Sequence, residues 1–167
     1  MENFTKSVNN DGKVAMSLAI AEKIFEIIEI SDEGYELGRS ALDDCWRWLE
    51  SKEIEANDLC DYVDHPDGET DISEFCYTAV GKEQICAWGV ILYAVSYVSW
   101  RAYKEDGYPP ESLDNTNDNL LATMIETALE TGMFEIESIN AVKEYLLKNY
   151  PATDDSSHKA IIKQDII

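Results

Sequence analysis

The chain has 167 residues, enough for one domain with its own hydrophobic core, and its 45% apolar and 28% charged residues are typical of a globular protein. With 34 acidic residues against 13 basic ones, the formal net charge is -21. This charge argues against nucleic-acid binding, which requires a basic face. A folded chain carries so much like charge for solubility, for life in high salt, or for a cationic partner.

The acidic residues are concentrated in two segments that contain no lysine or arginine. The first lies between Lys52 and Lys82, and the second lies between Lys104 and Lys143. Adaptation to high salt would spread the acidity evenly along the chain. Two unmixed segments therefore favour an anionic surface that meets a partner.

The cysteines indicate a reducing compartment. The opening residues MENFTKSVNNDGK lack the apolar region of a signal peptide. The cysteines lie in apolar patterns without the CxxC spacing of a metal or redox site, at Cys45, Cys60, Cys76 and Cys86. We expect reduced, mostly buried thiols in a cytoplasmic protein that holds no zinc and no other cofactor.

Helical periodicity dominates the chain from residue 13 onward. In the first helix, apolar residues step by four and three along one face, from Val14 and Leu18 to Phe25 and Ile28. Turn residues, glycines and prolines mark the later ends, with a long loop at 107–118. We predict seven helices, at about 13–30, 33–52, 57–65, 72–80, 85–103, 119–131 and 135–150.

The segment ICAWGVILYAVSYVSWRAY is the longest apolar stretch. Its charge-free part is short for a membrane span and contains Gly89, Ser96 and Ser99, so we expect no membrane insertion. A helix that is apolar all round normally lies at the centre of a bundle. We therefore predict an all-α, single-domain bundle of about seven helices around a central apolar helix at 85–104. Its core spans about 13–151, and residues 152–167 are expected to form a flexible tail.

The stretch ALDDCWRWLE places two tryptophans on different faces of one helix, since positions two apart do not face each other. Trp46 falls on the core stripe. Arg47 falls on the far side, where Asp43 and Glu50 are at pairing distance along the helix. Trp48 shares a second stripe with Asp44. That stripe either packs on another helix or contacts a cationic partner, because tryptophan beside a carboxylate suits an interface anchor.

Carboxylates recur every three residues in NDLCDYVDHPDGETD, at Asp58, Asp61 and Asp64, with Asp67 following. This row is either a solvated anionic face or a set of Mg²⁺ ligands. The first helix offers a comparable row at Glu22, Glu26 and Glu29. The two rows together define the alternative function, an all-α Mg²⁺-dependent phosphohydrolase.

The order of these segments resembles the all-α immunity proteins of bacterial polymorphic toxin systems, in the family catalogued as immunity protein six. LAIAEKIFEIIE is followed by GYELGRSALDDCWRWLE, NDLCDYVDH, the central apolar helix and KEYLLKNYP. The likeness spans about residues 13–151, and GRSALDDCWRWLE is its most specific part.

The resemblance implies a small non-enzymatic protein that protects its producer by binding a cognate toxin, without a cofactor. It supplies no binding motif, so the candidate contacts come from the sequence patterns alone. A basic, nuclease-like toxin would suit the net charge. The candidate partner-binding residues are Asp44, Trp48, Asp58, Asp61, Asp64 and Asp67. An exposed Trp48 stripe could equally serve a homodimer.

Overall fold

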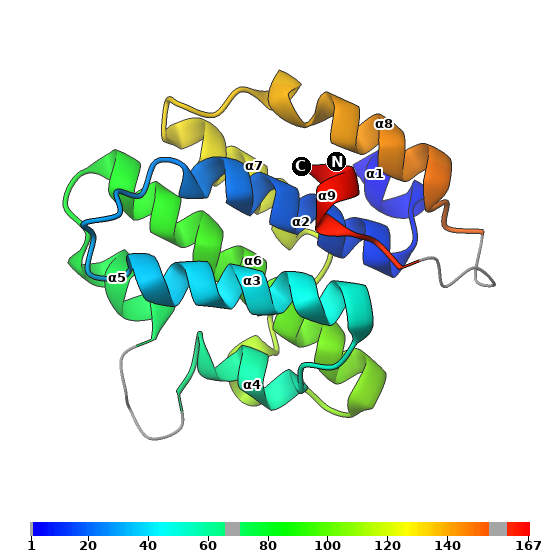
Figure 1. The fold of residues 1–167 in the computed structure, drawn as a ribbon, viewed down its shortest axis with the longest axis horizontal. Helices are drawn as coiled ribbons and strands as arrows, with labels where there is room; N and C mark the ends of the chain where they lie inside the picture. Colours follow the sequence, from blue (N-terminus) through cyan, green and yellow to red (C-terminus); the bar gives the residue numbers. More distant parts are fainter. Residues whose placement is uncertain (1, 66–70, 154–159) are drawn as a thin grey trace.

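The structure is a computed structural model that describes residues 2–65, 71–153 and 160–167 (Figure 1). Within these ranges the chain forms nine α-helices, two short 3-10 helices and no strand beyond an isolated bridge between Val8 and Pro151. The helices are α1 (Glu2–Ser7), α2 (Asn10–Phe25), α3 (Tyr35–Ser51), α4 (Ala56–Asp61), α5 (Ile72–Thr78), α6 (Lys82–Asp106), η1 (Glu111–Leu113), α7 (Leu120–Glu130), η2 (Ile136–Ile139), α8 (Asn140–Asn149) and α9 (Lys163–Ile166). The prediction of an all-α bundle is confirmed.

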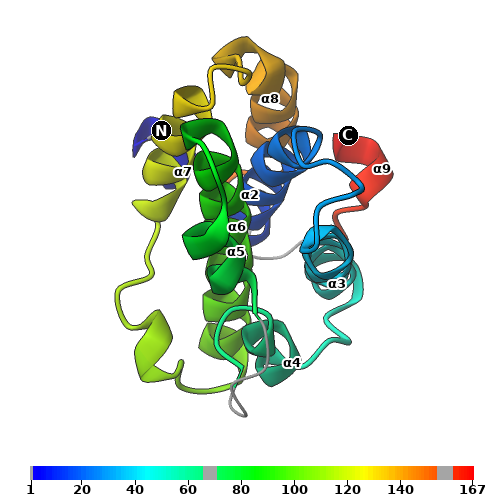
Figure 2. The ribbon, with the colours of Figure 1, turned by 90° about the vertical axis from the view of Figure 1, so that its left-hand side faces the viewer.

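The central helix is α6, as predicted. It packs against α2, α3, α4, α5 and α7, and Trp88 and Tyr97 on it are fully buried. In Figure 2, α6 stands in the middle, with α7 and η1 on one side and α3 and α4 on the other. In the described part of the chain α6 is the one helix long and apolar enough to cross a membrane, and most of its apolar stretch is buried inside the fold.

One face of α6 reaches the surface, however. Ile85 is 46% exposed, and Gly89, Leu92 and Ser96 are half-buried. These positions are three and four residues apart, so they lie on one stripe of the helix. The sequence pattern alone predicted burial all round, because the stripe contains apolar and small residues that burial would also suit.

The packing of α3 on the core depends on glycines. A Cβ at Gly34 would lie 2.7 Å from the rings of Phe75 and Trp88, and one at Gly38 would lie 2.9 Å from the ring of Phe25. The GYELG segment therefore owes its glycines to close approach of the helix to three aromatic rings.

Helix ends differ from the predictions in a few places. The Asn9 side chain caps α2 by accepting from the Gly12 N–H at 2.9 Å, so the helix starts at Asn10 rather than at residue 13. The same helix ends at Phe25 because the N–H groups of Ile27 and Ile28 donate to carbonyls three residues earlier and turn the chain. The predicted start of the last long helix forms η2 instead.

The C-terminal residues 160–167 pack on the bundle, whereas the sequence predicted a flexible tail at 152–167. Ile161 is 1% exposed and Ile166 is 9% exposed. The Lys163 N–H donates to a carboxylate oxygen of Glu50 at 2.8 Å, which fixes α9 against α3 (Figure 1). The prediction was wrong for these residues because two buried isoleucines and one lysine are too short a pattern to predict docking.

Candidate functional site

The Trp48 stripe on α3 packs inside the molecule. Trp48 is 2% exposed, and the Lys52 ammonium lies 3.5 Å from its ring centroid. The neighbouring Asp44 carboxylate accepts from the Tyr62 hydroxyl, just beyond α4, at 2.8 Å. Of the two predicted roles for Trp48, packing is therefore correct. Lys52 covers the ring in this structure, and a partner contact through Trp48 stays a prediction.

Arg47 pairs with a different carboxylate from the two predicted. Its guanidinium donates to Asp44 at 2.8 Å, three residues earlier on the helix. Asp43 instead binds Arg39 at 2.8 Å and Lys163 at 3.3 Å, and Glu50 binds the backbone of α9. Helical periodicity allows Arg47 to pair with any of these three carboxylates. The position of α9, which binds Asp43 and Glu50, leaves Asp44 for Arg47.

Glu22 on α2 is the centre of a half-buried ionic cluster, named here the Glu22 cluster. Its carboxylate accepts two hydrogen bonds from Arg39 at 2.7 and 2.8 Å, one from the Trp46 indole N–H at 2.9 Å, and one from Lys163 at 2.7 Å. Burial alone would raise the pKa of Glu22, but the hydrogen bonds and charges of Arg39 and Lys163 outweigh it and lower the pKa. The cluster thus joins α2, α3 and α9.

This arrangement occupies Glu22, the first of the three glutamates that the sequence offered as Mg²⁺ ligands. Glu22 is held by two cations, and Glu26 accepts from Lys23 at 3.3 Å. No group of three or more metal-ligating side chains lies together in the ranges that the structure describes. Within residues 2–65, 71–153 and 160–167, no geometric observation favours the phosphohydrolase alternative.

A second ionic cluster surrounds Asp118, in the loop before α7. Its carboxylate binds Lys13 of α2 at 2.7 Å, Arg101 of α6, and the Tyr97 hydroxyl at 2.9 Å. Burial would raise the pKa of Asp118, but Lys13 and Arg101 lower it overall. The side chains of both cations are only 12% exposed.

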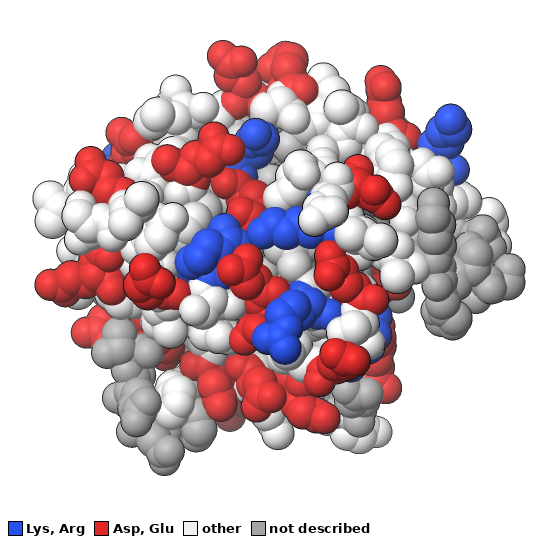
Figure 3. Space-filling view, in the orientation of Figure 1, with Lys and Arg blue, Asp and Glu red and all other residues white. Residues whose placement is uncertain are grey.

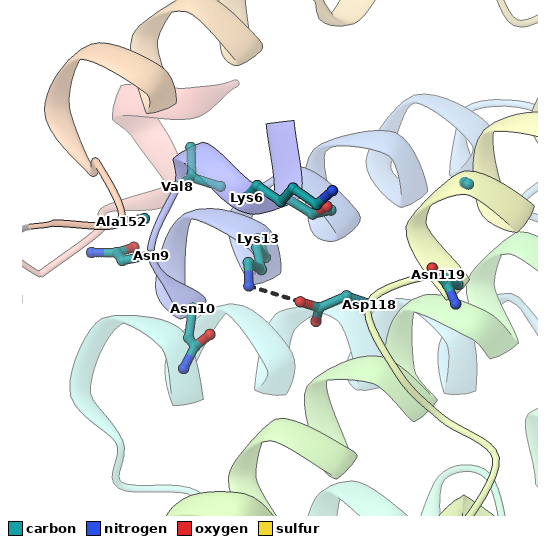
Figure 4. Close-up of a pocket in the computed structure, with 10 residues that line it drawn as sticks. Lys6, Val8, Asn9, Asn10, Lys13, Asp118, Asn119 and Ala152 are labelled. Carbon is teal, nitrogen blue, oxygen red and sulfur yellow. Dashed lines mark hydrogen bonds and ion pairs between the residues drawn. The ribbon is translucent and has the colours of Figure 1, made fainter. Parts of the chain in front are cut away.

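Lys13 and Asp118 line an open pocket of about 720 Å³ and pair with each other there (Figure 4). Asn9, Asn10 and Asn119 also line this pocket. Because Lys13 and Asp118 bind each other there, the pair fastens α2 to the start of α7. We assign this ion pair a structural role.

The acidic row on α4 lies at the surface. Asp58 and Asp64 are exposed and Asp61 is half-buried, while Leu59 and Cys60 form the buried side of the helix. Asp67 lies outside the described residues. Three of the four predicted carboxylates are therefore placed where a partner could reach them, and their role in binding stays a prediction.

Next to this row, the exposed stripe of α6 forms the floor of a hollow of about 310 Å³, named here the α6 groove. Its floor consists of Leu92, Tyr93 and Ser96. One wall comes from the end of the α4 segment and from α5, and the opposite wall comes from η1, the following loop and the start of α7. The wall residues are Val63, Ser73, Ser112, Leu113, Asn115, Thr116 and Leu120.

The side of the molecule formed by α2, α3 and α9 differs from the acidic α4 surface because it carries lysine and arginine. There the cations lie among carboxylates, as Figure 3 shows for the face that carries α2, α3 and α9. Arg39 and Lys163 share Glu22 and Asp43, and Arg47 binds Asp44. These cations are used within the fold, so the carboxylates elsewhere on the surface carry the unbalanced charge.

The fold and surface are those of an acidic helical bundle, and comparison with protein-family models assigns the chain to a class, the immunity proteins. The matching family is described as Immunity protein Imm6, and its model covers residues 12–131. That range is more than half of the chain, so the protein belongs to this family, as the sequence resemblance indicated. Comparisons with curated proteins and with solved structures find no match.

The family match extends from α2 to the end of α7. It therefore includes the central helix, both walls of the α6 groove, and the carboxylates at the centre of the two ionic clusters. The sequence alone showed the acidic residues of both walls only as negative charge in two separate segments. The one sequence feature that could have indicated a shared surface was the absence of lysine and arginine from both segments.

Proposed function

We propose that this protein neutralises a cognate toxin domain by stoichiometric binding in the cytoplasm of the cell that produces it. Membership of the immunity-protein family is the observation that carries this proposal. The toxin is a basic domain such as a nuclease, because a net charge of -21 attracts a cationic cleft and carboxylates can occupy the positions of phosphates. Binding, not chemistry, is the protective act.

The exposed carboxylates on and just after α4 support the electrostatic part of this proposal. Asp58 and Asp64 have no lysine or arginine near them in sequence, from Glu53 to Gly81. Unbalanced charges of this kind accelerate encounter with an oppositely charged protein, and salt screens the effect.

The test uses the cognate toxin domain, which is sought in the gene adjacent to the one that encodes this protein. Co-expression with this protein should restore growth of a host that the toxin domain alone inhibits, and calorimetry should give a stoichiometry of about one. Continued growth inhibition despite folded immunity protein, or no binding at micromolar concentrations, would reject the proposal.

The acidic row is tested separately by reversing two charges. Asp61→Lys with Asp64→Lys should slow association by roughly 10-fold at low ionic strength, and the loss should shrink in high salt. Glu33→Lys with Glu36→Lys is the matched control, since both residues are exposed beside or on α3 and the net charge changes equally. Equal on-rates for the two double variants would show that overall charge matters and the α4 row does not.

A further inference from the structure

We infer that the α6 groove is the surface on which the toxin docks, and that it receives a basic segment of the toxin carrying one apolar side chain. This inference rests on the proposed function and specifies its interface. The groove combines an apolar floor with an acidic rim, and the two features come from different parts of the chain.

The floor can take an apolar side chain. Leu92 and Tyr93 are half-buried on α6, and Leu113 and Leu120 line the opposite wall. From Gln84 to Trp100 the helix carries no charged residue. A hollow of about 310 Å³ has the volume of a small-ligand pocket, enough to enclose an aromatic or aliphatic anchor, and such buried anchors dominate the affinity of protein interfaces.

The rim follows from the sequence neighbours of the lining residues. Asp64 follows Val63, and Glu74 follows Ser73, on one wall. On the other wall Glu111 precedes Ser112, and Asp114 follows Leu113. All four acidic residues are exposed. Adjacent residues are about 3.8 Å apart along the chain, so the backbone of four exposed acidic residues lies next to the lining residues of the two walls.

The two base-free segments of the sequence supply the two walls. The α4–α5 wall lies within 53–81 and the η1–α7 wall lies within 105–142, and neither range contains a lysine or an arginine. Folding therefore places two separate acidic segments on opposite sides of one apolar strip. This juxtaposition determines the chemistry of the occupant, because a neutral or acidic segment would leave the rim carboxylates unpaired next to a desolvated surface.

The experiment measures binding of the cognate toxin domain to variants of the full chain. Ser96→Arg fills the groove from its floor, and Thr116→Trp fills it from the loop on the far wall. Each should weaken binding by roughly 30-fold or more, the loss expected when an interface anchor is displaced. Ser40→Arg, at an exposed position of α3, is the matched control and should bind like the wild type.

A pair of charge reversals tests the acidic rim on the wall formed by η1 and the start of α7. Glu111→Lys with Asp114→Lys should slow association by roughly 10-fold at low salt. Circular dichroism and thermal melting of every variant establish that it is folded. Ser96→Arg and Thr116→Trp lie on different elements, so a local folding defect in one variant would not explain a loss of binding in both.

The outcomes separate the groove from the proposed function. If the wild type binds and protects while the folded groove variants bind equally well, the groove is wrong and the immunity function stands. If the wild type does not bind the toxin domain, both fail. If the wild type is a dimer in solution that Ser96→Arg dissociates, the groove holds a second copy of the chain, and the inference is overturned.

Discussion

Removing the charge at Glu22 is expected to destabilise the fold, because this carboxylate holds two cations. In Glu22→Gln the side chain keeps its size and one acceptor oxygen, but Arg39 and Lys163 lose their counter-ion. Loss of one partner of a buried ion pair costs roughly 3–5 kcal/mol. The side chains of Arg39 and Lys163 are 24% and 30% exposed, so water solvates them in part, and we expect a loss of about 2–3 kcal/mol.

The loss should depend on pH with a defined sign. The folded pKa of Glu22 is lowered from its ordinary value of 4.5, so its ionic contribution is fully present above that value. The contribution disappears as the pH falls through the folded pKa. The unfolding free energies of wild type and Glu22→Gln should therefore differ most at neutral pH and converge in acid.

Urea denaturation followed by tryptophan fluorescence measures this difference. Trp46 reports directly, because its indole N–H donates to Glu22 at 2.9 Å. In a thermal melt the same loss should lower Tm by about 5–10 °C for a chain of this length. Glu26→Gln is the matched control, since that side chain is 71% exposed and its ion pair is with Lys23 on the same helix face. If the two glutamine variants were equally stable at neutral pH, the Glu22 cluster would not contribute as described.

Three other predictions concern stability and reactivity. Trp48→Ala should lower the free energy of unfolding in urea by about 3–5 kcal/mol, because it removes a large side chain that is 2% exposed. Asp118→Asn should cost about 2–3 kcal/mol in the same assay, since it leaves two cations, each 12% exposed, without their carboxylate. Cys45 is fully buried, burial raises the pKa of its thiol, and Ellman's reagent should modify it only at the rate of unfolding.

Each of these three predictions can be checked by a contrary result or by a control. Trp48→Ala with a loss below about 1 kcal/mol would place that ring at the surface. Asp114→Asn, an exposed acidic residue near the same loop, controls for Asp118→Asn and should stay within about 0.5 kcal/mol of wild type. Modification of Cys45 as fast as that of half-buried Cys76 would contradict its burial.

The sequence by itself determined the helical class, the approximate places of seven helical segments and the family. Each of these depends on local pattern: an apolar face repeats every three or four residues whether or not its partner is known. For the same reason Trp46 could be assigned to the core, where it is 2% exposed. The docking of α9 was missed because a four-residue helix has too short a period to recognise.

Tertiary structure alone decided which of several equivalent neighbours each polar group contacts. Arg47 had three carboxylates within one helical turn, and the arrival of Lys163 beside Asp43 left Asp44 as its partner. Trp48 had two possible environments, and in the folded chain it is buried with Lys52 over its ring. Likewise, the two acidic segments are about 50 residues apart at their starts, 53 and 105, and only their packing on α6 puts them on the two walls of one groove. Periodicity acts over a few residues, whereas these contacts depend on how whole helices meet.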